Sequence, residues 1–423
     1  MKITLRCINC EEEYPANKFT YRCDICSNLL EVAQQFDFDG NYLKTIFDNR
    51  LKELKLPFSS GVWRYHELIL ELPVDKIISR NEGNTNLYQS KLLDSYTNSS
   101  LQIKHEGENP TGSFKDRGMT VATSMANVLG FTSLACASTG NTSASMASYA
   151  ASNGMNSYIF IPDGNIAYGK LSQALAYGGK TFQINGNFDD AMETVQQVCQ
   201  ERQIFLVNSI NPFRIEGQKS IIFELLQQRD WQVPDWIVLP GGNLGNVSAF
   251  GKALNELIEL DIIDKLPKIG LIQAEGANPF YQLVNKKLDT IEPMKPSTLA
   301  TAIKIGNPIS WKKALEVIKN SRGSVVQLSE QEILEAKAQV DRSGIGAEPA
   351  SCTSIGGIKK LRQQNLIKED DVVIAILTGN LLKDPDVTIK YHLGEFAINS
   401  GMINKPMKIE NNIDEILKNL YLN

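Results

Sequence analysis

The chain has 423 residues, of which 42% are hydrophobic and 22% are charged, so it can bury a substantial core and form two domains with an appendage. Its formal net charge of −5 argues against a general nucleic-acid binder, although a net charge cannot exclude a local basic patch. Because no apolar run is long enough to span a membrane or to serve as a secretory signal, and seven cysteines are unevenly spaced, we expect a soluble cytoplasmic protein without a membrane partner.

The N-terminal segment, residues 1–36, contains two Cys-x-x-Cys pairs, Cys7 with Cys10 and Cys23 with Cys26. Two such pairs can complete a tetrahedral shell of four sulfurs around zinc or iron. The segment is too short to build its own core, so a metal could supply its fold as a small ribbon. The alternative is a ribbon whose four thiols are reduced and hold no metal. The other three cysteines lie in apolar or small-residue contexts and are expected to pack in the core: Cys136, Cys199 and Cys352.

The rest of the chain changes from mixed character to a regular alternation of helix and strand. Phe47, Leu51, Leu54 and Leu56 suggest one amphipathic helix in the mixed region that follows the ribbon. Further on, helices are predicted at 118–129 and 168–177, and two more are predicted to end at Gly154 and at Leu260. Strands are predicted near Leu134 and at 158–161, 181–184, 204–207, 236–239, 269–274, 325–328 and 372–377. This alternation predicts an α/β fold with parallel sheets covered on both faces.

The first of three polar turns spans residues 109–118 and carries Lys115 where a loop enters a helix. An isolated lysine at a helix start is usually a solvated charge. An amine becomes a nucleophile at neutral pH when burial or a nearby cation disfavours its ammonium form, and the edge of an α/β domain can provide both. Lys115 is therefore a candidate nucleophile.

The second and third turns span residues 137–145 and 240–246, and each follows a predicted strand and precedes a predicted helix. In the third turn, glycines allow backbone N–H groups to converge on an anion, and the positive end of the following helix favours the same charge. The turn matches neither a Walker loop nor a G-x-G-x-x-G fingerprint, so nucleotide binding is not predicted. It is a candidate phosphate cradle.

A reactive lysine, a phosphate cradle and polar turns at strand ends are together what pyridoxal phosphate requires. With these features the chain resembles the threonine synthases, pyridoxal-phosphate enzymes of the tryptophan-synthase-β superfamily, also called fold type II. Besides the three turns, the resemblance rests on motifs that cover most of the chain, at 82–85, 208–219, 273–277, 300–308, 348–351, 377–380 and 382–385.

The resemblance implies two three-layer αβα domains with pyridoxal phosphate between them and the N-terminal ribbon attached. Residues 37–116 and 213–423 are expected to form the large cofactor-binding domain, and residues 117–212 the small α/β domain. Ligands in such folds bind beyond the carboxyl ends of the strands, which is where the three turns are predicted. The resemblance also implies a homodimer.

The resemblance further assigns a role to individual residues around the cofactor. Lys115 would form the Schiff base and then move protons at the substrate's Cα, Cβ and Cγ, which requires a pKa near neutrality. Asn141 would contact the phenolic oxygen, and Thr378 would meet the pyridine nitrogen through its hydroxyl, which makes the ring a milder electron sink than a carboxylate would. The backbone donors for the cofactor phosphate would be Gly242, Asn243, Leu244, Gly245 and Asn246.

The implied activity is that of a carbon–oxygen lyase that converts O-phospho-L-homoserine and water to L-threonine and phosphate. The family pattern assigns the substrate phosphate to Ser138, Thr142, Asn208, Ser209, Arg214 and Asn243. An arginine fork suits a phosphate dianion and would stabilise it as a leaving group. Arg214 is the residue that separates this assignment from the serine and threonine dehydratases, which share the fold but need no such site.

Two alternatives remain open at this stage. Asn86 replaces the usual proline after Glu-Gly-Asn-Thr, and Asn380 stands where a histidine is common, so a relative with an altered substrate is conceivable. The first alternative is a cysteate synthase-like enzyme that uses O-phosphoserine and sulfite. The second, from another class, is a zinc-ribbon interaction protein on an inactive scaffold, which intact Lys115, Asn141 and Thr378 oppose.

Overall fold

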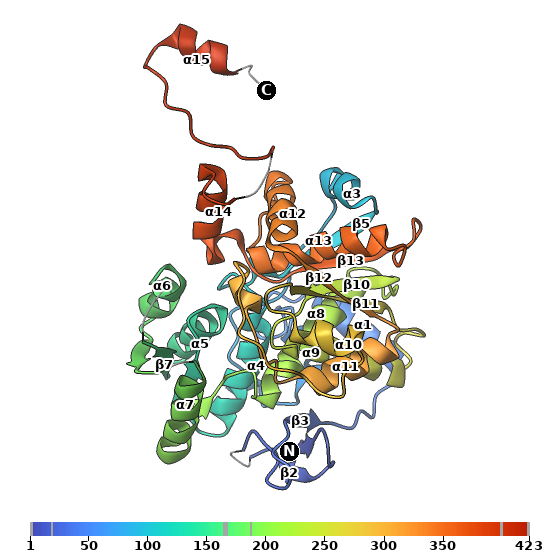
Figure 1. Cartoon of the computed structure of the whole chain (residues 1–423). Coiled ribbons are helices and arrows are strands. Elements are labelled where there is room, and N and C mark those ends of the chain that lie inside the picture. Colours follow the sequence, from blue (N-terminus) through green and yellow to red (C-terminus); the bar gives the residue numbers. More distant parts are fainter. Residues whose placement is uncertain (1–2, 18–19, 164–167, 187, 398–400, 421–423) are drawn as a thin grey trace.

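The computed structural model describes residues 3–17, 20–163, 168–186, 188–397 and 401–420. The N-terminal ribbon is an antiparallel sheet of β1 (Thr4–Cys7), β2 (Glu13–Pro15) and β3 (Leu30–Ala33) in the order β2-β1-β3. Leu5 and Cys7 of β1 face inward while Arg6 between them is exposed, as expected for alternating side chains in a strand. Figure 1 shows the ribbon, in dark blue, at the bottom of the molecule beneath α9 and α11.

A predominantly helical segment connects the ribbon to the first sheet. Helix α1 (Gly40–Arg50) begins at Asp39, whose side chain accepts a hydrogen bond from Tyr42 N at 2.8 Å, and it buries Leu43 and Phe47. The predicted extension of this helix through Leu51, Leu54 and Leu56 is wrong, because the chain turns after Arg50 and these three side chains are exposed, Leu54 by 92%. Short elements follow: η1 (Trp63–Tyr65), α2 (His66–Ile69) and η2 (Val74–Lys76).

The larger sheet has six strands in the order β12-β11-β10-β13-β5-β4. These are β4 (Leu87–Tyr88), β5 (Leu101–His105), β10 (Trp236–Pro240), β11 (Lys268–Ala274), β12 (Ser324–Leu328) and β13 (Val373–Leu377), and all are parallel except β4. Ile237 and Leu239 of β10 pack with α8 (Pro212–Gln227) and α9 (Gly245–Glu259), whereas Val238 packs with α13 (Pro349–Gln363). Helices therefore cover both faces of the sheet.

The remaining helices around this sheet complete the two outer layers. Helices α3 (Lys91–Thr97) and α12 (Glu330–Arg342) contact α13, and α11 (Trp311–Asn320) contacts α9. A capping box between Ser329 and Glu332 begins α12. The other short elements are η3 (Glu106–Glu108), α10 (Pro279–Asn285), η4 (Thr301–Ile303) and η5 (Leu381–Lys383).

The smaller sheet has four parallel strands in the order β8-β7-β6-β9. They are β6 (Ser133–Ala137), β7 (Asn156–Pro162), β8 (Lys180–Ile184) and β9 (Phe205–Leu206), and the accompanying helices are α4 (Lys115–Val128), α5 (Asn141–Ser152), α6 (Tyr168–Ala176) and α7 (Phe188–Arg202). On β6, Leu134 and Cys136 belong to the hydrophobic cluster shared with α4 and α5, whereas Ala135 and Ala137 pack with α7. This sheet is therefore also the middle of three layers.

The predicted α/β class with two three-layer units is confirmed. Strands β4 and β5 come from residues 37–116 and β10 to β13 from 213–423, whereas every strand of the smaller sheet lies within 117–212. The division of the chain into these domains stays a prediction.

Helices α4 and α8 pack against each other where the two units meet. A Cβ added to Gly217 of α8 would lie 1.8 Å from the carbonyl oxygen of Arg117, and one on Gly118 of α4 would lie 2.7 Å from that of Arg214. No side chain larger than hydrogen fits such a contact, so the two backbones lie directly against each other.

The C-terminal part of the chain leaves the body of the protein. Helix α14 spans Pro385–Leu393, and the extended residues 401–412 lead to α15 (Ile413–Leu420), which stands apart from both sheets in Figure 1. The apolar side chains Ile413, Leu417 and Leu420 of α15 are exposed. Within the part of the chain that the structure describes, no helix combines the length and apolarity needed to cross a membrane.

Candidate active site

Lys115 lies at the first position of α4, on a turn that is attached to the end of β13. Phe114 N donates to the carbonyl oxygen of Thr378 at 3.0 Å, and Asn380 N donates to that of Gly112 at 2.9 Å. Asp116 fixes the turn from within, because its carboxylate accepts from Thr111 N and Thr111 Oγ1, both at 2.7 Å. Two sequence regions more than 250 residues apart thereby place the lysine at the carboxyl edge of the large sheet.

The Lys115 amine is held in conditions that favour its neutral form. Burial, followed by the nearby Arg214 cation, lowers the pKa of Lys115 to about 7, against the opposing influence of Glu348. Its Nζ lies 3.9 Å from the centre of the Phe114 ring. Among the described residues, no hydrogen bond or ion pair holds this nitrogen. The neutral amine, which a nucleophile requires, is therefore far more accessible near neutral pH than in an ordinary lysine.

Arg117 lies two residues further along α4, and all of its nitrogens are paired. Its Nε and Nη2 donate to the carboxylate of Glu106 at 2.6 and 2.7 Å, and Nη2 also donates to Glu224 at 2.9 Å. Its Nη1 donates to the carbonyl oxygen of Gly61 at 3.0 Å and to Ser220 at 3.2 Å. These charge-assisted bonds anchor the first turn of α4 and with it the backbone of Lys115.

Asn141 begins α5 at the end of β6 and faces a carboxylate that the sequence did not single out by itself. Its Nδ2 donates to both carboxylate oxygens of Glu348 at 3.2 Å. Glu348 is 4% exposed, and burial raises its pKa, while the hydrogen bond from Asn141 opposes that rise. Glu348 N also donates to the carbonyl oxygen of Gly379 at 3.1 Å. Glu348 therefore connects Asn141 to the loop after β13 and lies near enough to Lys115 to influence its charge.

Thr378 directly follows β13, and its hydroxyl lies 2.9 Å from that of Ser351 on α13, where either oxygen can donate. Ser351 Oγ also accepts from Gly379 N at 2.8 Å, so the serine orients the threonine and the following backbone. The motif that contains Glu348 and Ser351 was visible in the sequence, but it gave no signal for their individual roles.

The candidate phosphate cradle lies between β10 and the start of α9. Leu244 adopts a left-handed conformation with φ of 66°, which is rare for a side chain of this kind and turns the backbone into the helix. No side chain caps the first turn of α9, and both polar side-chain atoms of Asn246 are buried without a hydrogen-bond partner in the described structure. Free N–H groups at a helix start, beside an unsatisfied amide, fit an anion such as the cofactor phosphate.

Arg214 lies in the first turn of α8, 3% exposed, and its charge is not paired with a carboxylate in the ion pairs of the described residues. Nη1 donates to the carbonyl oxygen of Val207 at 2.9 Å, whereas Nε is buried without a partner. Burial lowers the pKa of Arg214 to about 10, so the side chain stays protonated at neutral pH. A buried cation of this kind fits an anionic ligand.

The other predicted substrate residues surround the end of β6. The side-chain amide of Asn208 makes two hydrogen bonds with the backbone of Ala137. Its Oδ1 accepts from Ala137 N at 2.8 Å, and its Nδ2 donates to the Ala137 carbonyl oxygen at 3.0 Å. The Ser138 hydroxyl accepts from Gly140 N at 3.2 Å within its own turn. Thr142 and Ser209 are half-buried, and the described contacts include no side-chain hydrogen bond for either. Asn208 is thus placed to shape the turn.

The structure brings most of the predicted cofactor residues together through shared neighbours. Lys115 and Asn141 meet at Glu348, and Thr378 joins them through the loop after β13. Gly245 lies against α8, since a Cβ on it would contact Ile215 Cδ1 at 3.6 Å, one residue from Arg214. The roles of the individual residues stay predictions.

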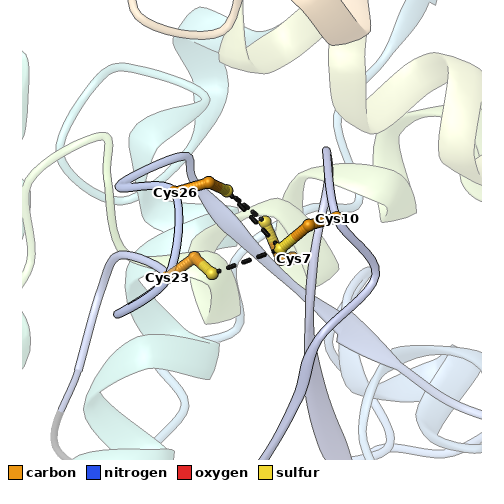
Figure 2. A group of neighbouring side chains, drawn as sticks. All are labelled: Cys7, Cys10, Cys23 and Cys26. Carbon is orange, nitrogen blue, oxygen red and sulfur yellow. Dashed lines mark hydrogen bonds between the residues drawn. The ribbon is translucent and has the colours of Figure 1, made fainter.

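The four cysteines of the N-terminal ribbon form a second cluster. Figure 2 shows that Cys7 and Cys10 come from the end of β1 and the turn after it, and that Cys23 and Cys26 face them from another turn. Their sulfur atoms all lie within 4.8 Å of one another, and no disulfide joins them. Four convergent thiols of this kind suit a tetrahedral metal ion.

Comparison with known proteins identifies the family. Residues 78–379 match the family model described as pyridoxal-phosphate dependent enzyme. The chain is 44% identical to a threonine synthase of Methanocaldococcus jannaschii, covering 98% of this chain and 99% of that protein. It is 42% identical to a threonine synthase of Methanosarcina acetivorans, over 99% and 98% of the two chains. It is also 36% identical to the chloroplastic threonine synthase 2 of Arabidopsis thaliana, over 94% and 80%.

Solved structures of lower identity share the fold. The processed form of threonine deaminase isoform 2 from Solanum lycopersicum superposes with a TM-score of 0.63 at 19% identity, over 78% of this chain and 92% of that one. Maize serine racemase gives 0.62 at 20% identity, over 74% and 93%. The sequence matches, which extend over 94–99% of this chain, are the more specific finding. The chain belongs to the threonine synthase family of pyridoxal-phosphate dependent enzymes.

Proposed function

We propose that this protein is a threonine synthase, which converts O-phospho-L-homoserine and water to L-threonine and phosphate. The observation that carries the proposal is that two unusual cations lie near each other. One is Lys115, whose pKa is lowered, and the other is Arg214, which is buried without a carboxylate partner among the described residues. The first suits an enzyme that forms a covalent bond to an aldehyde, and the second suits a substrate that bears a phosphate. The likeness to threonine synthases over nearly the whole chain supports the same assignment.

The described residues fit pyridoxal phosphate. Lys115 Nζ would bond to the aldehyde carbon of the cofactor, and Asn141 would hold its phenolic oxygen while Glu348 orients the amide. Thr378 would meet the ring nitrogen with its hydroxyl. The phosphate would lie at the start of α9 against Gly242, Asn243, Leu244, Gly245 and Asn246. When bound, the cofactor would supply an electron sink that stabilises negative charge beside the substrate's amino group.

The protein's own groups account for the remaining steps of the reaction. Arg214 would bind the substrate phosphate and stabilise it as the Cγ–O bond breaks and the phosphate leaves with the bonding electrons. Lys115, with a pKa near 7, can take protons from Cα and Cβ and return a proton to Cγ. The oxygen of water then adds at Cβ and a proton returns to Cα, which yields threonine with its hydroxyl at Cβ.

The test of this function combines a spectrum with a product assay. The purified protein should show a visible absorbance band that borohydride abolishes, and it should release phosphate from O-phosphohomoserine in equal amounts with threonine. A band without threonine would refute the substrate assignment, and the same preparation would then be assayed with O-phosphoserine and sulfite. The absence of a band after incubation with pyridoxal phosphate would refute the enzyme assignment.

We also propose that the protein acts as a homodimer in the cytoplasm. The exposed apolar side chains of α15 support association, because an amphipathic helix gains stability by covering its apolar face. All seven cysteines are free, as suits a reducing compartment. Analytical ultracentrifugation of the full chain, compared with a variant that ends before residue 404, would test the dimer. A monomeric full-length protein would contradict it.

A further inference from the structure

We propose that Cys7, Cys10, Cys23 and Cys26 bind one Zn²⁺ ion, and that the ribbon folded around this ion bridges the two domains beside the active site. The bridging role of the ribbon rests on the proposed function, because it concerns the residues assigned to the cofactor and the substrate phosphate. The binding of zinc by the four cysteines is independent of that function.

The geometry of the sulfur atoms supports the metal. The distances are 3.4 Å between Cys7 and Cys26, and 3.5 Å from Cys10 to both Cys23 and Cys26. Zinc–sulfur bonds of about 2.3 Å in a tetrahedron place the sulfurs a little under ~4 Å apart. The four thiols are therefore already close to the arrangement that a single ion would impose.

Groups around the sulfurs also favour a metal-bound state. Asn9 N donates to Cys7 Sγ at 3.4 Å, and Asn28 Nδ2 donates to Cys26 Sγ at 3.4 Å. Such donors stabilise thiolate sulfur and orient the ligands of a structural zinc site. The buried apolar side chains of the ribbon, such as Leu5, Leu30 and Val32, belong to a cluster shared with the rest of the protein and form no separate core, so metal binding would contribute much of the ribbon's own folding free energy.

The first contact of the ribbon reaches the large domain through Lys312, the second residue of α11. Lys312 Nζ donates to Asn9 Oδ1 at 3.0 Å and to Asn28 Oδ1 at 3.1 Å. These are the two asparagines whose nitrogens contact the cysteine sulfurs. Ser310 N, just before α11, donates to the carbonyl oxygen of Asn243 at 3.4 Å. The candidate metal site is thus connected to the candidate phosphate cradle by a short chain of contacts.

The second contact reaches the small domain through Tyr21, two residues before Cys23. Its hydroxyl accepts from Leu206 N at 2.9 Å, and its ring packs edge-on against Phe205 with centroids 6.2 Å apart. The residue that follows β9 is Val207, whose carbonyl oxygen accepts from Arg214 Nη1. The ribbon therefore fixes the strand that holds the candidate substrate arginine.

Loss of the ion should release both contacts at once. The asparagines would lose their fixed position beside the sulfurs, and Tyr21 would lose the folded turn that positions its ring. One core cluster of the large domain contains no ribbon residue, and the cluster on the α7 face of the small sheet has only Leu29 of the ribbon among its buried members. We therefore expect local opening at β9 and at the start of α11 while the sheets stay folded.

The metal is tested by elemental analysis of the purified full-length protein. One zinc per chain is expected, and Cys10→Ser with Cys26→Ser should reduce it at least tenfold. The control Cys199→Ala removes a cysteine outside the ribbon and should leave one zinc per chain. A wild-type protein without zinc, or with iron in its place, would overturn the metal assignment whether or not the protein makes threonine.

The bridge is tested by hydrogen exchange, which requires no substrate. Peptides that cover residues 204–210 and 309–313 should exchange at least tenfold faster in the zinc-free double variant than in the wild type. Because that variant can lose its fold, Tyr21→Phe combined with Lys312→Met offers a second test in which zinc remains bound and the same peptides exchange faster. Unchanged exchange in both variants would overturn the bridge, and threonine synthesis, measured separately, would report on the proposed function.

Discussion

Arg117 and Arg214 are both buried, and they lie on helices that touch, yet their surroundings differ completely. Arg117 is paired with Glu106 and Glu224, which raise its pKa far above the usual range despite its burial. Arg214 has one carbonyl oxygen as a partner, and burial lowers its pKa. A charge that the protein satisfies by itself holds the fold together, whereas a charge that it leaves unsatisfied suits a ligand.

Lys115 precedes Arg117 by two residues and lies close enough to Arg214 for that charge to lower its pKa, and its replacement gives the largest expected effect. Lys115→Ala should lower kcat/KM for O-phosphohomoserine by at least about 10³-fold, because it removes both the covalent attachment point and the proton-transfer group. Threonine formation and the borohydride-sensitive absorbance band would both be measured. Lys91→Ala, at the exposed start of α3, is the matched control and should keep full activity. Substantial threonine formation by Lys115→Ala would place the chemistry elsewhere.

The comparison predicts that Arg117 matters most for stability. Arg117→Met should lower the free energy of unfolding by about 3–5 kcal/mol, because Glu106 and Glu224 would be left as buried carboxylates with less compensation. Arg214→Met leaves no carboxylate without its partner among the described ion pairs, so it should lower the free energy of unfolding much less. Urea unfolding of the two variants provides the measurement. Equal losses would show that the two arginines do not differ as proposed.

Arg214 should matter most for substrate. Arg214→Gln should lower kcat/KM for O-phosphohomoserine by about 10- to 100-fold, which corresponds to the loss of a charged hydrogen bond worth about 1.5–3 kcal/mol. Steady-state kinetics at fixed pyridoxal phosphate would measure it, with Arg342→Gln, exposed at the end of α12, as the control. Unchanged kinetics for Arg214→Gln would exclude this residue from the phosphate site.

The smallest predicted effect concerns pH. In cofactor-free protein, Lys115 should capture pyridoxal phosphate at a rate that rises with pH through about 7, because only the neutral amine reacts. Arg214→Gln removes a cation that lowers this pKa, so the midpoint should shift upward. Glu348→Gln removes the group that raises it, so the midpoint should shift downward. Stopped-flow absorbance across a pH series would resolve the two signs, and shifts in the same direction would contradict the charge arrangement.

The sequence predicted those parts of the fold in which local pattern and tertiary structure agree. Apolar runs followed by polar turns located β6, β10 and β13. Strand β5 was missed because Lys104, although fully buried, is charged, and its partners Glu224 and Gln228 lie far along the chain. The apolar spacing of Leu51 and Leu54 predicted a helix with a buried face where there is none, because both side chains are exposed in the described structure.

For the candidate site, the sequence could indicate residue types at the turns but not their partners. Asn208 and Asn141 both look like ligand-binding amides, yet the structure shows that both ends of Asn208 are occupied by Ala137. Glu348 was visible only as part of a motif, because its influence on Lys115 and Asn141 depends on a contact across the two domains. Such roles depend on three-dimensional proximity, which a linear pattern does not contain.

The glycine contact between α4 and α8 has a consequence for the length of the substrate. Gly118 and Gly217 hold the two helices backbone to backbone, so the separation between the Lys115 and Arg214 backbones does not depend on any side-chain rotamer. With Lys115 at the reacting end of the substrate and Arg214 at its phosphate, as proposed, this contact would set the distance between the two ends. The main chain itself would then discriminate between the four-carbon phosphohomoserine and the three-carbon phosphoserine. Replacing either glycine would change the distance between the Lys115 and Arg214 backbones and therefore the length of substrate that fits.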